Sequence, residues 1–360
     1  MRRINYIHQL ERWPNFVFDL PKLTNALGRI QFLQGRLHGQ MEQLTPELRK
    51  QAIINALSAE TQASCDIEAA HFDQLEIESA VARSLKIRIP DMVPSGGMAK
   101  GAAEMVVQAA AKHDKKLSSE QLCQWHTLLY PSEKGITIGA WRNHPLDIKD
   151  PKTGNIRFAA PNSDLLIGEM KRFIQWINQD LETHPLIKSG IAHLWFLTLH
   201  PFEDGNGQLS RAISLSLIAA SEAGLPRYHA PSVILSKEKE TYFQMLENTQ
   251  SGNLDITEWL QWYMAIIEKS ITDLKLVQAE VITKQKLEEK MEFKGLTINQ
   301  KQVLRTLSQQ ETPYFTSADW SAVAGYSKDT ALREIRTLLN LRLIQKLSHG
   351  GRSTRYRIAN

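Results

Sequence analysis

The 360-residue sequence predicts a mainly α-helical protein with one exposed β-hairpin and a small α+β unit at its C-terminal end. Two observations support this class. Apolar residues recur at spacings of three and four in residues 20–43, 47–62 and 71–86, which is typical of amphipathic helices. Residues that break helices are concentrated in a few short segments rich in Pro, Gly, Asn and Asp.

Two of these segments interrupt the helical pattern. The stretch from Pro90 to Gly97 contains prolines and glycines and predicts a loop. In residues 138–161, two extended runs flank the turn-forming residues 150–155, which favours an exposed hairpin over the alternative of a plain connecting loop. Helical patterns follow in residues 165–178 and 185–199.

The composition indicates a globular protein of two or three domains, with 42% hydrophobic and 23% charged residues. No apolar run approaches the roughly 18 residues of a membrane span. The first twenty residues are interrupted by charged side chains and do not resemble a signal peptide. Cys65 and Cys123 lack the spacing of a zinc or redox site. We therefore expect a cytoplasmic protein without membrane contact.

A short polar segment, HPFEDGNGQLSR at residues 200–211, lies between two helical patterns. Gly205-Asn206-Gly207 opens the second helix, where backbone N–H groups and the helix dipole together can hold a phosphate. Asp204 offers a carboxylate oxygen that suits Mg²⁺ beside phosphates. Arg211 lies one turn further on and can reach the distal end of a triphosphate.

His200 supplies the titratable group of this segment and can take a proton from an attacking hydroxyl. Phe202 provides an apolar anchor for the loop. Each residue also has a plainer interpretation, since Gly-Asn-Gly is a common turn and an Asp before a helix is commonly a cap. The combination of a base, a metal ligand, an anion cradle and an arginine within twelve residues favours a nucleotide site.

The segment resembles the signature of the Fic family, HxFx(D/E)GNGRxxR. The matching positions are His200, Phe202, Asp204, Gly205, Asn206, Gly207 and Arg211. Gln208 departs from the signature because it replaces the first arginine, which puts the strength of phosphate binding in doubt.

The resemblance implies a helical Fic core that uses ATP as co-substrate and transfers AMP to Ser, Thr or Tyr hydroxyls of a protein, with release of pyrophosphate. It implies that His200 is the general base and that Asp204 holds Mg²⁺. The nucleotide-binding residues implied are Gly205, Asn206, Gly207, Gln208 and Arg211.

The resemblance extends over roughly residues 1–270, through Trp13-Pro14-Asn15-Phe16 and Gly139-Ala140-Trp141-Arg142. It implies an N-terminal helical domain at 1–110 and a catalytic core at 111–270. The hairpin at 138–161 then corresponds to a flap that binds the target polypeptide by strand addition. The flap residues implied are Asn155, Ile156 and Arg157.

A second family motif, (S/T)xxxE(G/N), marks an inhibitory helix and matches at Ser64 and Glu68 within residues 58–70, with Ala69 in place of the usual Gly or Asn. A carboxylate paired with Arg211 occupies the guanidinium that grips the γ-phosphate, so ATP binds unproductively. A solvated helix glutamate is the alternative. Inhibition predicts that Glu68→Gly raises activity.

Recognition of the nucleotide base is left open by the sequence. Tyr242 and Phe243 can present aromatic faces to adenine, and similar proteins place an aromatic pair in this region. The equal alternative is that both are core residues at helical spacing with Leu246.

The C-terminal part is a basic module. Residues 271–296 are expected to form a helical connector, and residues 297–360 carry ten Lys or Arg against four Asp or Glu, a net charge of +6. A helix–turn–helix pattern with Ser327 as a cap, followed by two short strands, resembles a winged-helix domain. Such domains bind DNA or proteins, and both partners are open here.

Two functions compete at this point. One is a protein adenylyltransferase regulated by Glu68, which acts on other proteins or on itself; the other is a DNA-binding regulator whose Fic core senses nucleotide. His200 favours the enzyme, because a sensor needs no base. Removal of AMP, use of another nucleotide donor, and a homodimer are also open.

Overall fold

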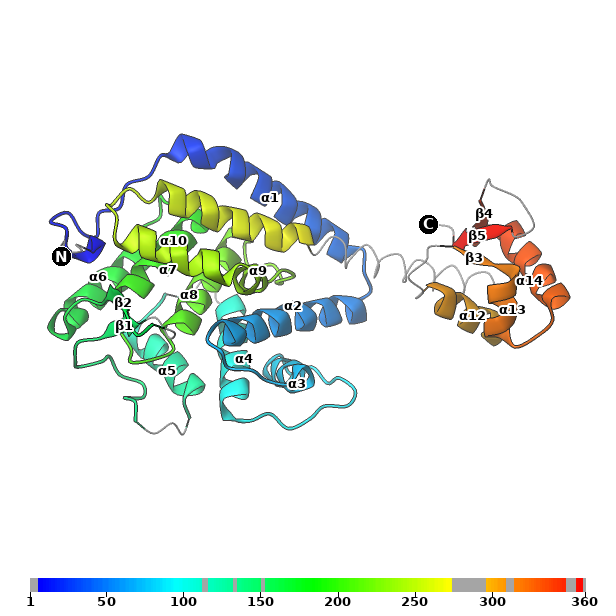
Figure 1. Cartoon of the computed structure of the whole chain (residues 1–360), viewed down its shortest axis with the longest axis horizontal. Coiled ribbons are helices and arrows are strands. Elements are labelled where there is room, and N and C mark those ends of the chain that lie inside the picture. The colour runs from blue at the N-terminus through cyan, green and yellow to red at the C-terminus, as the bar shows by residue number, and fades with distance from the viewer. Residues whose placement is uncertain are drawn as a thin grey trace. The chain divides into compact units, whose positions relative to one another are not determined.

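The computed structural model describes residues 6–111, 116–131, 135–149, 153–273, 296–308, 314–347 and 354–358. The chain separates into two compact units, residues 1–274 and 275–360 (Figure 1). The mainly helical class predicted from the sequence is confirmed. In the parts of the chain just given, the helices are too short or too polar to span a lipid bilayer.

The first unit is a helical assembly with one two-stranded sheet among its described residues. Its elements are η1 (Ile7–Gln9), α1 (Leu20–Glu42), α2 (Pro46–Ile67), α3 (Gln74–Ser84), α4 (Gly97–Ala111), α5 (Ser119–Leu129), β1 (Asp147–Lys149), β2 (Ile156–Ala159), η2 (Ser163–Leu165), α6 (Leu166–Gln179), α7 (Pro185–Leu199), α8 (Asn206–Ser221), α9 (Pro231–Lys237) and α10 (Lys239–Gln250). Residues 257–273 are also helical.

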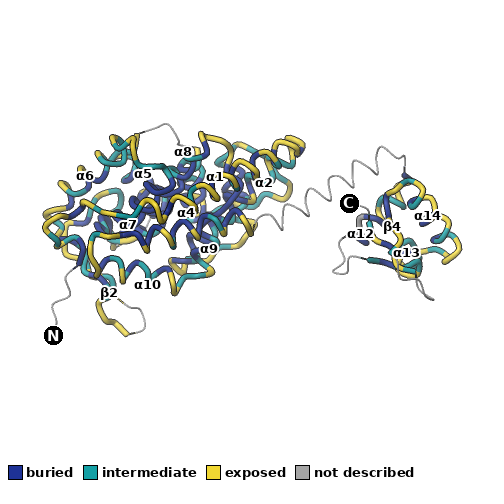
Figure 2. The backbone as a smooth tube through the Cα atoms, turned by 90° about the horizontal axis from the view of Figure 1, so that it is seen from above, coloured by how far each residue is buried: buried dark blue, intermediate teal, exposed yellow. Residues whose placement is uncertain are grey.

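The helix α7 forms the centre of this unit and is buried on all sides from Leu186 to Leu199 (Figure 2). The sequence pattern indicates a single apolar face, but α6, α8 and residues 257–273 cover the others. Gly190 allows the last of these to approach closely, since a Cβ there would lie 2.8 Å from Leu260 Cδ2. A helix that is apolar nearly all round is stable in such a position.

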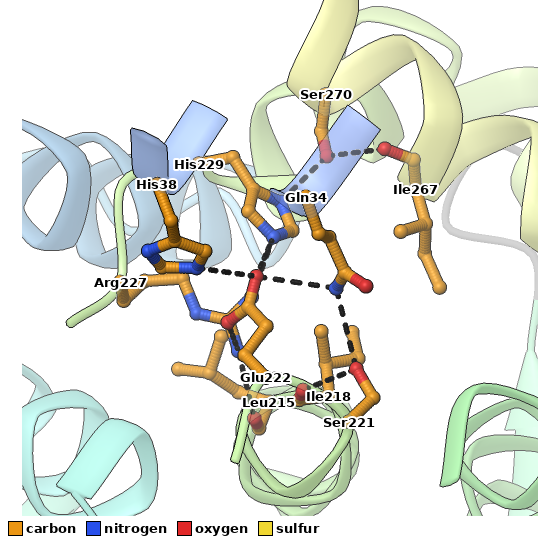
Figure 3. Close-up of polar contacts among 10 residues, drawn as sticks. All are labelled: Gln34, His38, Leu215, Ile218, Ser221, Glu222, Arg227, His229, Ile267 and Ser270. Atoms are coloured by element: carbon orange, nitrogen blue, oxygen red, sulfur yellow. Dashed lines mark hydrogen bonds and ion pairs between the residues drawn. The ribbon is translucent and has the colours of Figure 1, made fainter. Parts of the chain in front are cut away.

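A buried polar cluster joins α1 to the end of α8 (Figure 3). Gln34 of α1 donates to Glu222 Oε1 at 3.1 Å, and Arg227 Nη2 lies 3.2 Å from Glu222 Oε2. His229 Nε2 lies 2.9 Å from Glu222 Oε1. Burial alone raises the pKa of Glu222, but Arg227 and His229 outweigh it and hold that pKa far below its usual range. The carboxylate therefore stays charged and ties the N-terminal helix to the core.

The predicted hairpin is present but shorter than expected. β1 and β2 pair antiparallel with Ile148 opposite Phe158, and the turn at 150–152 lies outside the described residues. Phe158 is buried and packs edge-on against Tyr6, with ring centroids 4.9 Å apart. This contact joins the hairpin to the N-terminal segment.

The second unit contains α12 (Ile298–Ser308), β3 (Phe315–Thr316), α13 (Ser317–Ala324), α14 (Lys328–Asn340), β4 (Ile344–Lys346) and β5 (Arg355–Ile358). The sheet order is β3-β5-β4, so β3 adds a strand that the sequence pattern did not indicate. Ser327 caps α14, as predicted. Trp320, Ile335 and Tyr356 contribute to its own buried core.

The domain boundaries expected near residues 110 and 296 stay predictions. The contacts within the chain group residues 1–274 into a single compact unit. Most of the expected connector at 271–296 lies outside the described residues. The expected inhibitory helix at 58–70 is the C-terminal part of α2, which runs without a break from Pro46.

Candidate active site

His200 ends α7 in the left-handed conformation, with φ 46° and ψ 59°. Its Nδ1 lies 3.2 Å from the carbonyl oxygen of Leu197. A carbonyl can only accept, so this contact assigns the proton to Nδ1 and leaves the lone pair on Nε2. Burial lowers the pKa of His200 to about 4. The imidazole is therefore neutral at pH 7, which is the form that accepts a proton.

The loop after His200 is held by the Asn206 side chain. Asn206 Oδ1 accepts from Phe202 N at 3.0 Å, and Asn206 Nδ2 donates to Phe202 O at 2.8 Å. Gly205 precedes the helix with φ 74°, a conformation that glycine adopts without strain. The loop therefore delivers the first N–H groups of α8, which have no partners within the helix, to one place.

The base of the loop rests on aromatic side chains. Phe202 is fully buried and stacks on His126, with ring centroids 4.2 Å apart. Trp141 packs against the same ring at 4.7 Å. The role of Phe202 as an anchor agrees with this packing.

Arg142 is a buried clamp that sequence reasoning did not single out as a site residue. Its guanidinium donates to the carbonyls of His200 at 2.8 Å, His144 at 2.8 Å and Pro161 at 2.7 Å. It therefore joins the loop to both ends of the hairpin segment. The residue type alone carries no signal for this role, because the acceptors are backbone groups far away in the sequence.

The guanidinium of Arg211 is occupied by the end of α2. Nε donates to Ser64 Oγ at 2.8 Å, and Nη2 donates to Ser64 O at 2.9 Å and to Glu68 Oε1 at 2.9 Å. Arg211 is buried, whereas the Glu68 side chain is 35% exposed. The structure thus brings Arg211 together with Ser64 and Glu68, which precede it by 147 and 143 residues.

The Glu68 carboxylate also covers the start of α8. A Cβ added to Gly207 would lie 1.9 Å from Glu68 Oε1, so only a glycine leaves room for this oxygen. The space that the sequence assigns to a phosphate is therefore filled by a carboxylate. The start of a helix favours anions, and here the carboxylate of Glu68 from the same chain lies at that position.

Comparison with protein families assigns two segments of the chain. Residues 116–218 match the Fic/DOC family, and residues 6–87 match a family described as a domain of unknown function, DUF4172. The first match includes the whole loop, α7 and most of α8. Residues 116–218, which include the candidate site, are therefore a Fic/DOC-like segment of the chain.

Curated relatives of the Fic region are named protein adenylyltransferase Fic. Those of Drosophila sechellia and Drosophila mojavensis are 30% and 31% identical over 104 residues, which is 28% of this chain. The match spans about a fifth of the length of these relatives, 20% and 19%.

Solved structures share the fold. A Fic family protein from Desulfovibrio desulfuricans superimposes with a TM-score of 0.57 at 19% identity, covering 94% of this chain and 96% of that one. A Fic-domain-containing signaling protein from Bacteroides thetaiotaomicron gives a TM-score of 0.52 at 17% identity, covering 70% and 94%.

Two positions of the Fic signature differ in their surroundings. Asp204 is exposed, and its Oδ1 accepts from Gly205 N at 2.7 Å. Gln208 is buried and hydrogen-bonds the Cys65 thiol, so it faces the C-terminal part of α2. Within the described ranges, no three His, Cys, Asp or Glu side chains form a metal cluster, and the role of Asp204 in holding Mg²⁺ stays a prediction.

The aromatic pair expected at the adenine pocket divides into two environments. Tyr242 is buried, and its hydroxyl lies 2.8 Å from His193 Nε2, so the alternative of a core role describes it. Phe243 is only partly buried, with Lys239 Nζ 6.0 Å from its ring centroid. A nucleotide-binding role stays a prediction for both residues.

The residues predicted to form a target-binding flap lie at the start of β2 and directly before it. Asn155 and Ile156 are exposed, with 51% of Ile156 accessible, while Arg157 Nε lies 3.3 Å from Glu247 Oε1 of α10. An exposed apolar side chain beside a short strand is compatible with peptide addition. The role of these residues in target binding stays a prediction.

Proposed function

We propose that this chain is a protein adenylyltransferase that moves AMP from ATP to hydroxyl side chains of proteins and is inhibited by its own Glu68. The observation that carries the proposal is that the Fic loop, residues 200–211, already holds an anion: Glu68 Oε1 lies 2.9 Å from Arg211 Nη2 and against Gly207. The curated relatives that bear the name adenylyltransferase support the same activity.

The loop fits the phosphates of ATP. Backbone N–H groups at the start of α8 and the Arg211 guanidinium face the space that Glu68 now covers. Asp204 is the exposed carboxylate that would hold Mg²⁺ beside them. The ion supplies charge neutralisation for the phosphates.

His200 is placed to act as the general base. The acceptor hydroxyl oxygen forms a bond to the α-phosphorus, the bond from that phosphorus to the bridging oxygen breaks, and pyrophosphate leaves. The hydroxyl proton goes to His200 Nε2, the nitrogen left free by the contact of Nδ1 with Leu197 O. Arg142 holds the backbone of His200 in place during this transfer.

The proposed test measures incorporation of label from α-labelled ATP with Mg²⁺ into the protein itself and into a lysate, followed by mass spectrometry of AMP adducts. We expect Glu68→Gly to label more strongly than the wild type, and Glu68→Gly combined with His200→Ala to label no more than background. The matched control is Glu42→Gly, the same substitution at the exposed end of α1.

Unchanged or weaker labelling by Glu68→Gly would remove the inhibitory role of Glu68. If neither the wild type nor Glu68→Gly labels any protein, and neither of them binds ATP with Mg²⁺, the adenylyltransferase proposal is rejected. Release of AMP from a modified protein that needs an intact Glu68 favours the reverse reaction instead.

A second candidate function concerns the second unit. We propose that residues 297–360 form a winged-helix domain that contacts duplex DNA. Exposed residues on α14 include Lys328, Arg333 and Arg336, while Ala331 and Ile335 face the core, so the cations lie on the solvent side of the helix. A basic exposed helix of this kind suits phosphate contacts in a major groove.

The test is a titration of the full chain with a duplex of mixed sequence at several salt concentrations. We expect binding that weakens as salt rises, and a smaller salt dependence for Arg333→Ala combined with Arg336→Ala. The control changes Arg29, which is exposed on α1 of the first unit. Salt-independent binding, or none, favours a protein partner for this unit.

A further inference from the structure

The inhibitory helix has a second anchor, which lies two turns before Glu68. Glu60 is 3% exposed on α2, and its Oε2 accepts from the backbone N–H of Ser232 at 2.9 Å. Its Oε1 accepts from the Ser232 hydroxyl in a short hydrogen bond. Ser232 lies in the first turn of α9, and α2 and α9 pack against each other.

The two anchors lie on one face of α2. Glu60, Ser64 and Glu68 are spaced by four residues, so they line up along the helix, about 12 Å from first to last. Ser64 and Glu68 bind Arg211 of α8, while Glu60 binds the start of α9. A helix held at both points can neither slide nor rotate without losing one of them.

We propose that the contact between Glu60 and Ser232 fixes the register of α2 and so determines how firmly Glu68 covers the Fic loop. This regulation rests on the proposed function. Glu60 is a positioning residue, because it touches neither Arg211 nor the start of α8 by any hydrogen bond of the described residues.

The chemistry of the contact argues against a role in packing alone. Burying a carboxyl group costs free energy unless its hydrogen bonds are directional and complete, so apolar side chains fill a helix interface at lower cost. Burial raises the pKa of Glu60, and the hydrogen bonds from Ser232 and the charges of Arg227 and Arg211 oppose that rise. A group of this kind specifies one alignment of two helices over others.

The test uses Ser232→Ala in the full-length chain, because this change leaves Arg211, Glu68 and the loop untouched. The variant removes one of the two donors to Glu60, and we expect AMP transfer to rise about fivefold. In the Glu68→Gly background we expect no further rise, since the helix then carries no inhibitor. Hydrogen–deuterium exchange should also become faster in residues 60–70.

The matched control is Ser79→Ala, which removes a fully buried hydroxyl of α3 that accepts a hydrogen bond from the backbone N–H of Val93. It should leave AMP transfer unchanged. Glu60→Gln is the second variant if Ser232→Ala does not fold, and it should change activity and exchange in the same direction.

If Glu68→Gly is active but Ser232→Ala is not raised above the wild type, the inference is overturned. If Ser232→Ala raises AMP transfer equally in the wild-type and Glu68→Gly chains, the inference is overturned too, because the effect then does not depend on Glu68. If Glu68→Gly is inactive, the proposed function fails, and exchange decides the inference alone: faster exchange at 60–70 supports a register contact, and unchanged exchange rejects it.

Discussion

Ala69 offers a sharp test of the proposed inhibition by Glu68, because it follows that residue with φ 59°, a left-handed conformation. Its N–H donates to Asp66 O at 3.1 Å, and the next N–H donates to Cys65 O at 3.0 Å, so the helix end depends on this conformation. A non-glycine residue pays about 1–2 kcal/mol there. Glycine removes this cost, but it loses more chain entropy on folding than alanine does. The net stabilisation expected for Ala69→Gly is therefore about 1 kcal/mol.

Ala69→Gly should therefore stabilise the arm that places Glu68 on Arg211. If this stabilisation favours the inhibited state, AMP transfer falls about fivefold. The thermal midpoint of the first unit should rise by about 2 °C. Ala69→Gly is thus expected to lower AMP transfer, whereas Glu68→Gly is expected to raise it, although the two substitutions are at adjacent positions.

The assay compares labelling by α-labelled ATP with the thermal unfolding of each variant. The matched control is Ala223→Gly, which makes the same substitution at φ 50° after α8, away from the inhibitory arm. It should raise the thermal midpoint without changing activity. Higher activity of Ala69→Gly, or lower activity of both variants, refutes the link between the helix end and inhibition.

Three further predictions follow from the same geometry. Asn206→Ala should destabilise the protein by about 2–3 kcal/mol in denaturant unfolding, because it leaves both backbone groups of Phe202 unpaired. Glu222→Ala should cost about 3–5 kcal/mol in the same experiment, because it leaves the buried Arg227 guanidinium without its carboxylate. Burial lowers the pKa of His200 to about 4 and that of His193 to about 3. Below pH 6.5 the unfolded chain therefore binds more protons than the folded chain, so the thermal midpoint should fall as the pH drops from 6.5 toward 4. A midpoint that is constant over that range contradicts the assignment of neutral histidines.

Much of the candidate site was predictable because its parts are contiguous. Residues 200–211 carry the base, the acidic residue, the glycines and the arginine between two helical patterns, and the Fic/DOC match contains the same segment. The helices of the first unit follow the apolar spacing of the sequence closely, as α1 does at Leu20–Glu42. Local chemistry decides such features, so a sequence can reveal them.

Other features depended on neighbours from distant segments. Asn206 turns its amide to Phe202, so its side chain supports the loop, while its predicted contact with phosphate stays a prediction. Tyr242 enters the core because His193 of α7 meets its hydroxyl. Burial and partners of this kind arise from packing, which periodicity alone does not specify.

The sequence by itself determined the loop of residues 200–211, the helical character of the chain and the basic composition of its end. Only the tertiary structure decided that the Glu68 carboxylate lies on Gly207, that Arg142 clamps His200, and that Glu60 aligns α2 with α9. The physical reason is range: helix periodicity and turn chemistry act over a few residues, whereas these contacts join groups 58 to 172 residues apart.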